Sequence, residues 1–139
     1  MTNDSISRKK ILIVDDDELH LAITENSLKD KYEVFLVNSG EEALEFLDKS
    51  NLIPDLILLD ILMPVMDGWI VFDRIHDIAS LKFTPILFYT SLDEENAKEK
   101  AYELGAFDFI TKPCVPAVLL DKLSKSLWKA DLLKQQYGS

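Results

Sequence analysis

Cysteine, long apolar runs and positive charge are all scarce in this chain. Cys114 is the single cysteine, so no disulfide can form within the chain, and one thiol suits a reducing compartment. No apolar run approaches the roughly 20 residues that a membrane span needs. The first ten residues, MTNDSISRKK, lack the apolar core of a signal peptide. We therefore expect a cytoplasmic protein with no membrane segment.

The shortage of positive charge restricts the partners that the chain can bind. Aspartate and glutamate number 25 against 15 lysines and arginines, which gives a formal charge of −10. A surface this negative repels phosphate backbones, which argues against direct nucleic-acid binding. It suits a cationic ligand, a metal ion or a basic protein surface.

The length and the composition predict one folded domain. The chain has 139 residues and an apolar fraction of 47%, enough for one sizeable core and too much for a disordered segment. No internal repeat, low-complexity segment or linker interrupts it. We expect the domain to span residues 9–135, with a flexible tail at 1–8 and a short tail at 136–139.

Five short apolar runs recur along the chain, separated by segments long enough for helices. Each run has the length of a strand, and unbroken apolarity is typical of strands buried on both faces of a parallel sheet. The runs are residues 11–14, 34–37, 56–59, 86–89 and 107–110, the last of which is interrupted by Asp108. This alternation predicts a (βα)₅ domain, an α/β fold in which helices cover a parallel sheet.

The segment after the fourth run has the clearest helical pattern. Ala97, Ala101 and Leu104 recur at the spacing of one helix face, and Gly105 would end the helix. The stretch 91–94 begins with Ser and ends with Glu, which is the pattern of a capping box. We therefore expect the helix to begin there.

Two further helices are predicted from apolar spacing. Leu120, Leu123 and Leu127 form one stripe in the last segment, which predicts a final helix packed on the sheet. A third helix is expected at about residues 65–79, where apolar side chains cover much of the circumference.

Polar side chains follow four of the apolar runs directly. Asp15-Asp16-Asp17 follows the first run, Asp60 the third, Thr90-Ser91 the fourth and Lys112-Pro113 the fifth. Right-handed crossovers place the carboxyl ends of all the strands at one edge of the sheet, where open α/β sheets bind ligands. We expect these four stretches to meet at that edge.

Crowded carboxylates repel one another unless a cation compensates them. Mg²⁺ or Mn²⁺ takes oxygen ligands and keeps several waters, so two or three carboxylates plus a carbonyl suit it. Thr90 offers a hydroxyl and Lys112 a positive charge. Asp60 could then be a nucleophile for a phosphoryl group, with the metal and Lys112 neutralising the charge that develops during transfer.

Each motif alone has a simpler interpretation. Acids after a strand usually cap a helix, and Asp17 is the one that we expect to do so. Thr90-Ser91 is typical of a helix cap, whereas Met63-Pro64 and Asp67-Gly68 are typical of turns. Cys114 is better explained as a small core residue than as a nucleophile. The occurrence of all the motifs in order, each at the end of a predicted strand, favours the phosphoryl site.

The chain resembles a response-regulator receiver domain of two-component signalling, of the chemotaxis-Y type. The stretches that carry the resemblance are ILIVDDD (11–17), PDLILLDILMPVMDG (54–68), PILFYTS (85–91) and GAFDFITKP (105–113). The resemblance as a whole covers about residues 9 to 130. The resemblance implies a flavodoxin-like, doubly wound sheet of strand order 2-1-3-4-5 with helices on both faces.

The resemblance also implies roles for the residues at the strand ends. Asp60 stands where the family accepts phosphate, and Lys112 stands at the lysine that contacts the phosphoryl oxygens. Asp15 and Asp16 stand at the paired metal acids, which with Asp60 and the backbone carbonyl of Leu62 would bind Mg²⁺. The resemblance thus implies a signalling receiver and not an enzyme. Such a receiver assists only its own phosphorylation and dephosphorylation.

A switch and a set of partners are implied as well. Thr90 stands at the switch hydroxyl, Phe109 at a switch aromatic that is often Tyr, and Lys112-Pro113 at a bond that is cis in the family. The donor would be a sensor histidine kinase or a histidine phosphotransfer protein. The surface made by the fourth helix, fifth strand and fifth helix would then control a downstream protein or output domain. Whether the domain acts alone or within a larger regulator or hybrid kinase stays open.

Slow self-dephosphorylation is expected from two apolar residues. Positions two past the acceptor and two past the switch hydroxyl flank the path of the attacking water in this family. They are Leu62 and Leu92 here, and neither side chain can hold or polarise a water molecule.

Other classes fit parts of the sequence. A haloacid-dehalogenase-type phosphatase also uses an Asp nucleophile with Mg²⁺, but Leu19 replaces its expected Thr or Val, and Asp60 would have no role. A phosphorylation-independent docking module would have lost the acceptor or the lysine. Acids in the first loop argue against an FMN site. His20 and His76 fall in predicted helices and are poor phosphodonor candidates.

Overall fold

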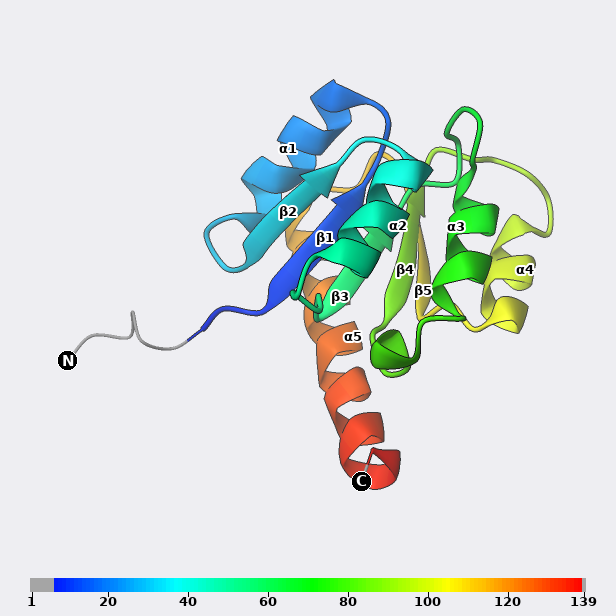
Figure 1. Ribbon diagram of the computed structural model, residues 1–139. Helices are drawn as coiled ribbons and strands as arrows, with labels where there is room; N and C mark the ends of the chain where they lie inside the picture. The colour runs from blue at the N-terminus through cyan, green and yellow to red at the C-terminus, as the bar shows by residue number, and fades with distance from the viewer. Residues whose placement is uncertain (1–6, 139) are drawn as a thin grey trace.

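A five-stranded parallel sheet forms the centre of the molecule (Figure 1). The computed structural model describes residues 7–138, so most of the expected N-terminal tail lies outside the described residues. The strands are β1 (Lys10–Val14), β2 (Glu33–Val37), β3 (Leu56–Leu59), β4 (Ile86–Thr90) and β5 (Asp108–Thr111). Their order is β2-β1-β3-β4-β5, and every neighbouring pair is parallel. The expected (βα)₅ fold and strand order are confirmed.

Five helices connect and cover the strands. They are α1 (Glu18–Leu28), α2 (Gly40–Lys49), α3 (Gly68–Ile75), α4 (Ala97–Leu104) and α5 (Pro116–Tyr137), with a short 3₁₀ helix, η2 (Ala79–Leu81). The C-terminal end of α5 projects beyond the sheet in Figure 1 and runs past residue 135, where the domain was expected to end. None of the helices in residues 7–138 has the length and apolarity that crossing a membrane requires.

The sheet separates two apolar cores. Alternate strand residues point to opposite faces, so Leu12 and Val14 face one core, while Ile11 and Ile13 face the other. The first, the α2–α3–α4 core, contains buried residues of those three helices, and the second, the α1–α5 core, contains those of α1 and α5. Both faces of β3 are therefore covered, and all four of its residues are buried.

The expected third helix is shorter than predicted. It was expected at 65–79, but α3 spans Gly68–Ile75 and η2 follows separately. Asp67 ends the preceding loop by accepting a hydrogen bond from the Ile70 amide at 3.1 Å, which makes it the N-cap. Val65, with a φ of 67°, cannot be part of a right-handed helix.

The prediction for the start of α4 was also wrong. The helix begins at Ala97, and its N-cap is Asn96 in the left-handed region with no side-chain cap. Gly105 ends it in the same region, at a φ of 106°, as the sequence predicts. Ala97 and Ala101 are buried, but Leu104 is 45% exposed, so only two small side chains anchor this helix.

The last helix packs on the sheet as expected, with a small shift of its buried stripe. Leu123 and Leu127 are buried as predicted, but Leu119 takes the buried position that was expected for Leu120, which is only partly buried. Cys114 is partly buried against the α1–α5 core rather than enclosed within it.

Candidate functional site

The carboxyl ends of β1, β3, β4 and β5 bring four side chains to one place. Asp15 follows β1, Asp60 follows β3, Thr90 ends β4 and Lys112 follows β5. Backbone hydrogen bonds continue between these positions, from the Asp60 amide to the Val14 carbonyl and from the Lys112 amide to the Thr90 carbonyl, each 2.9 Å long. The register of the sheet therefore fixes the relative positions of the backbone at these residues.

Three carboxylates form a cluster at this edge. Asp15, Asp16 and Asp60 each place an oxygen within 4.8 Å of the others. Asp15 and Asp60 are buried, at 3% and 6% exposure, whereas Asp16 is exposed. Oxygen donors of this number and charge fit a hard divalent cation such as Mg²⁺.

Asp17 has a separate function as the N-cap of α1. Its carboxylate accepts hydrogen bonds from the amides of Leu19 and His20, at 2.9 and 3.2 Å. These amides, that of His20 first, hold the pKa of Asp17 below its usual value. The Asp17 amide in turn donates to Asp15 Oδ1 at 2.9 Å, which orients the Asp15 carboxylate. The expected assignment of the cap to Asp17 is confirmed.

Lys112 lies between the two buried carboxylates. Its ammonium pairs with Asp15 Oδ2 and lies 3.6 Å from Asp60 Oδ2, and its side chain is only 8% exposed. The Tyr89 ring lies 5.3 Å from the ammonium, and His20 Nδ1 lies 3.5 Å from it. The Lys112-Pro113 peptide bond is cis, as the family resemblance implied.

The Asp60 carboxylate ionises less readily than a free aspartate, as the direction of its pKa shows. Burial raises the pKa of Asp60, and the Thr90 hydroxyl and the Lys112 ammonium lower it in part. The Asp15 charge raises the pKa again, and the Leu62 amide, which donates to Asp60 Oδ1 at 3.3 Å, lowers it. A divalent cation in this cluster would favour the ionised form, which is the nucleophilic one.

Thr90 and Phe109, the two expected switch residues, lie on the same side of the sheet. Thr90 is fully buried, and its hydroxyl accepts a hydrogen bond from the Leu92 amide at 3.1 Å. Phe109 is 7% exposed and packs into the α2–α3–α4 core, with its ring centroid 6.3 Å from that of Phe88. The aromatic ring is therefore in an inward position in this structure.

The β3–α3 loop depends on a glycine whose importance the sequence did not reveal. A Cβ at Gly68 would lie 2.3 Å from the Asp60 carbonyl oxygen and 2.6 Å from Ile61 Cα. Any side chain would therefore displace the backbone of Asp60 and Ile61. The only signal in the sequence was Asp67-Gly68 itself, which we interpreted as a turn.

A groove of about 520 Å³ borders the site between the β3–α3 and β4–α4 loops. Leu62 and Leu92 both line it, together with Trp69. Leu62 is 47% exposed, and Leu92 packs partly against the α2–α3–α4 core. The two leucines thus lie close to the approach to Asp60.

Comparisons with known proteins agree on one family. The family model described as the response regulator receiver domain matches residues 11–124. The alkaline phosphatase synthesis transcriptional regulatory protein PhoP of Bacillus subtilis is 37% identical over 89% of this chain and 50% of its own length. Response regulator PleD of Caulobacter vibrioides is 35% identical over 89% of this chain and 27% of its own length. The chain thus spans half or less of these curated relatives.

Solved structures show the same similarity across nearly the whole chain. The signal receiver domain of a putative Luxo repressor protein from Vibrio parahaemolyticus superposes with a TM-score of 0.83 and 28% identity, over 95% of this chain and 99% of that one. A CheY-like receiver domain protein from Methanospirillum hungatei gives a TM-score of 0.81 and 29% identity, over 90% and 98% of the two chains.

Proposed function

This chain belongs to the response regulator receiver domain family of two-component systems, and on that premise we propose that Asp60 is its phosphoacceptor. The observation that carries the proposal is the buried Asp60 carboxylate beside both Lys112 and a second buried acid. Because the whole match is to a receiver domain, the haloacid-dehalogenase alternative is rejected. The chain acts as a signalling receiver that assists its own phosphorylation.

The acidic cluster is the proposed Mg²⁺ site. Asp15, Asp16 and Asp60 supply carboxylate oxygens, and the Leu62 carbonyl completes the protein ligands, with Mn²⁺ as a substitute. The bound cation would neutralise charge on the phosphoryl oxygens. Asp17 is already engaged with the α1 amides and is not one of the ligands.

The chain's own residues perform the transfer. An ionised Asp60 oxygen attacks phosphorus while the bond from phosphorus to the donor histidine nitrogen breaks, and the electron pair leaves with the imidazole. Lys112 would then hold a phosphoryl oxygen, because its ammonium already lies 3.6 Å from Asp60 Oδ2. The Thr90 hydroxyl would donate to another oxygen.

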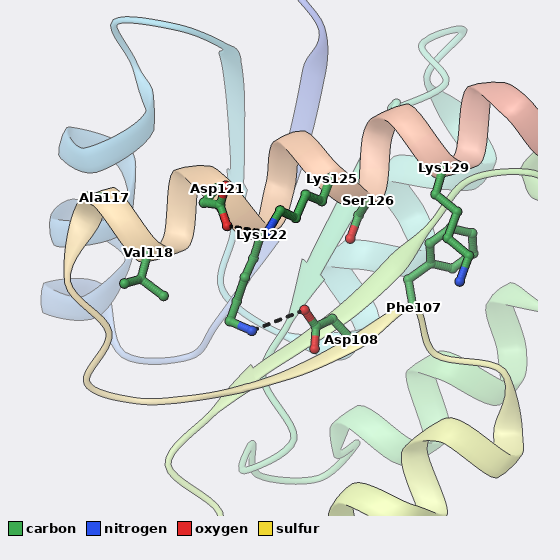
Figure 2. Close-up of a pocket in the computed structure, with 9 residues that line it drawn as sticks. All are labelled: Phe107, Asp108, Ala117, Val118, Asp121, Lys122, Lys125, Ser126 and Lys129. Carbon is green, nitrogen blue, oxygen red and sulfur yellow. Dashed lines mark ion pairs between the residues drawn. The ribbon is translucent and has the colours of Figure 1, made fainter.

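The donor and the output partner follow from the same premise. The donor is a sensor histidine kinase or a histidine phosphotransfer protein of the cytoplasm, and a downstream protein or output domain reads the change at α4, β5 and α5. A groove of about 590 Å³ lies on this surface between β5 and α5. In Figure 2, Lys122 of α5 reaches across it to Asp108 of β5, 3.5 Å away.

Mass spectrometry with a small phosphodonor tests the proposal. Phosphoramidate with Mg²⁺ should add one phosphoryl group to the wild type, and chelating the metal should abolish the reaction. Asp60→Asn should stay unmodified. If Asp60→Asn gains a base-labile phosphate at the wild-type rate, the assignment of the acceptor is wrong.

The phosphoryl group should be lost slowly without a partner. Leu62 and Leu92, which line the groove beside the site, offer no polar group to orient an attacking water. Replacing both with polar residues, Leu62→Asn with Leu92→Glu, should speed the decay by roughly tenfold, the effect of one water-positioning contact. Decay of the phosphoprotein in Mg²⁺ buffer measures this, and a wild-type lifetime of seconds would contradict it.

A further inference from the structure

The Lys112 ammonium has four neighbours at the site, and they come from different elements. It pairs with Asp15 Oδ2 and lies 3.6 Å from Asp60 Oδ2, so β1 and β3 supply its two anionic partners. It also lies 5.3 Å from the centroid of the Tyr89 ring. The fourth neighbour is His20 Nδ1, in the first turn of α1, at 3.5 Å. Of these four, His20 alone combines a directional contact with a group that is not a carboxylate.

The surroundings of the His20 ring make Nδ1 an acceptor. A neutral imidazole has one N–H and one acceptor nitrogen, so the neighbours of each nitrogen decide the tautomer. Nδ1 lies 3.8 Å from Asp17 Oδ2, which is beyond hydrogen-bond distance. It lies closer to the Lys112 ammonium, at 3.5 Å, and an ammonium can only donate. An unprotonated Nδ1 therefore accepts an N–H group of Lys112.

The start of α1 holds His20 in a fixed position relative to the site. The His20 amide donates to Asp17 Oδ1 at 3.2 Å, which places the residue in the capped first turn. The Asp17 amide donates in turn to Asp15 Oδ1 at 2.9 Å. These bonds connect the His20 backbone to the Asp15 carboxylate, although the His20 side chain itself is 44% exposed.

A divalent cation at the acidic cluster would weaken two of the contacts of Lys112. Asp15 and Asp60 belong to the cluster, so a bound cation shares their negative charge and repels the ammonium beside them. His20 contributes no atom to the cluster, and its contact with Lys112 survives the binding of the cation. The share of His20 in holding Lys112 therefore increases when the metal binds.

We propose that His20 is a positioning residue, which keeps Lys112 directed at the phosphoryl group in the metal-bound site. The inference rests on the proposed function, because it concerns the ammonium that would hold a phosphoryl oxygen. An ammonium has three N–H groups. His20 Nδ1 occupies one of them from the side of α1, and the others stay directed toward Asp15 and Asp60. His20 acts only through Lys112.

The variants His20→Leu and His20→Asn form a matched pair for the test. Leucine and asparagine have nearly the same shape, but only asparagine places an acceptor oxygen at the position of Nδ1. With phosphoramidate and saturating Mg²⁺, His20→Leu should be labelled at least about threefold more slowly than the wild type, since it loses a long, partly exposed hydrogen bond to a charged group. His20→Asn should restore most of the rate. Phosphoramidate presents no protein surface, so these rates are independent of docking.

Two measurements that do not depend on phosphorylation complete the test. The dissociation constant of Mg²⁺, from a chemical-shift titration, should stay within about twofold of the wild type in both variants, because an imidazole is not a preferred ligand of this hard cation. With Mg²⁺ bound, the NMR order parameter of the Lys112 side-chain methylenes should fall in His20→Leu and be kept in His20→Asn. His76→Leu, which replaces the other histidine at the end of α3, is the control and should change neither quantity.

The outcomes separate this inference from the proposed function. If His20→Leu is labelled at the wild-type rate, or if His20→Asn is as slow as His20→Leu, His20 does not position Lys112. Weaker Mg²⁺ binding in His20→Leu would also overturn the inference, because the effect would then act through the metal. If phosphoramidate fails to label the wild type, the proposed function is wrong, and the Lys112 order parameters still decide the role of His20.

Discussion

Asp15, Asp16 and Asp17 are adjacent in the sequence, but each has a different environment. Asp15 is buried and paired with Lys112, Asp16 is exposed, and Asp17 caps α1. From the sequence alone, replacing either Asp15 or Asp16 is expected to relieve repulsion, and Asp16→Asn is expected to leave the metal-free fold as stable as before or more stable. The structure separates them, because only Asp15 has a buried cationic partner.

The replacements Asp15→Asn and Asp16→Asn should therefore differ in stability. Both should weaken Mg²⁺ binding, since each removes a carboxylate ligand. Without metal, Asp16→Asn should be as stable as the wild type or slightly more stable, whereas Asp15→Asn should lose about 1–3 kcal/mol, because Lys112 loses a buried partner. Urea unfolding with a chelator measures both, and a marked loss in Asp16→Asn would contradict the assignment.

Sequence patterns predicted the positions of the site residues better than they predicted the local backbone geometry. Asp60, Thr90 and Lys112 could be placed together because each ends an apolar run, and parallel strands end at one edge. The left-handed conformation of Val65 could not be predicted, since valine is among the residues least suited to it. The close approach of Gly68 to Asp60 is a contact made only by the folded loop.

The boundaries of α4 show how tertiary contacts override a local pattern at the scale of one element. Ser91 and Glu94 have the spacing of a capping box. Thr90, however, is buried at the site, and its hydroxyl accepts a hydrogen bond from the Leu92 amide. The chain therefore stays irregular after β4, and the helix begins only at Ala97. Its end at Gly105 was predictable because a left-handed C-cap is a local property of glycine.

Contact between Lys100 and Trp69 compensates for the small buried surface of α4. The Lys100 ammonium lies 4.2 Å from the centroid of the Trp69 ring, and Trp69 packs on Phe88 with centroids 5.0 Å apart. Phe88 in turn contacts Phe109. One cation–π contact thus connects α4 to the aromatic residues behind the site.

Replacing Lys100 with glutamine should loosen α4 without unfolding the domain. The side chain stays polar, becomes one atom shorter and loses its charge, so stability should fall by at most about 1 kcal/mol. Hydrogen exchange of the α4 amides should become several-fold faster, and the Trp69 fluorescence should change. Lys98→Gln, which alters an exposed lysine on the same helix, is the control. Equal effects of the two variants would show that the Trp69 contact has no special importance.

For the whole molecule, the sheet acts as a partition between the two cores. The order of its strands followed from the family resemblance, since apolar runs alone predict strands but not their neighbours. Phe109, Phe88 and the alanines of α4 belong to the α2–α3–α4 core, whereas α1 and α5 pack on the opposite face. A change that begins at Thr90 would therefore reach α4 and β5 through packed side chains of one core.

Phosphorylation should consequently shift the population of packings mainly around α4 and β5. Because the Phe109 ring is already packed inward, a rearrangement of α4 and of the β4–α4 loop around Thr90 is expected to carry most of the change. Backbone amide chemical shifts, compared before and after phosphorylation with Mg²⁺ present throughout, should change most at residues 90–104 and 107–112. Lys100→Gln should reduce the shifts in α4 and leave those around Asp60 intact, which separates transmission from chemistry. Changes concentrated in α1 and α2 would show that the signal leaves the site by another route.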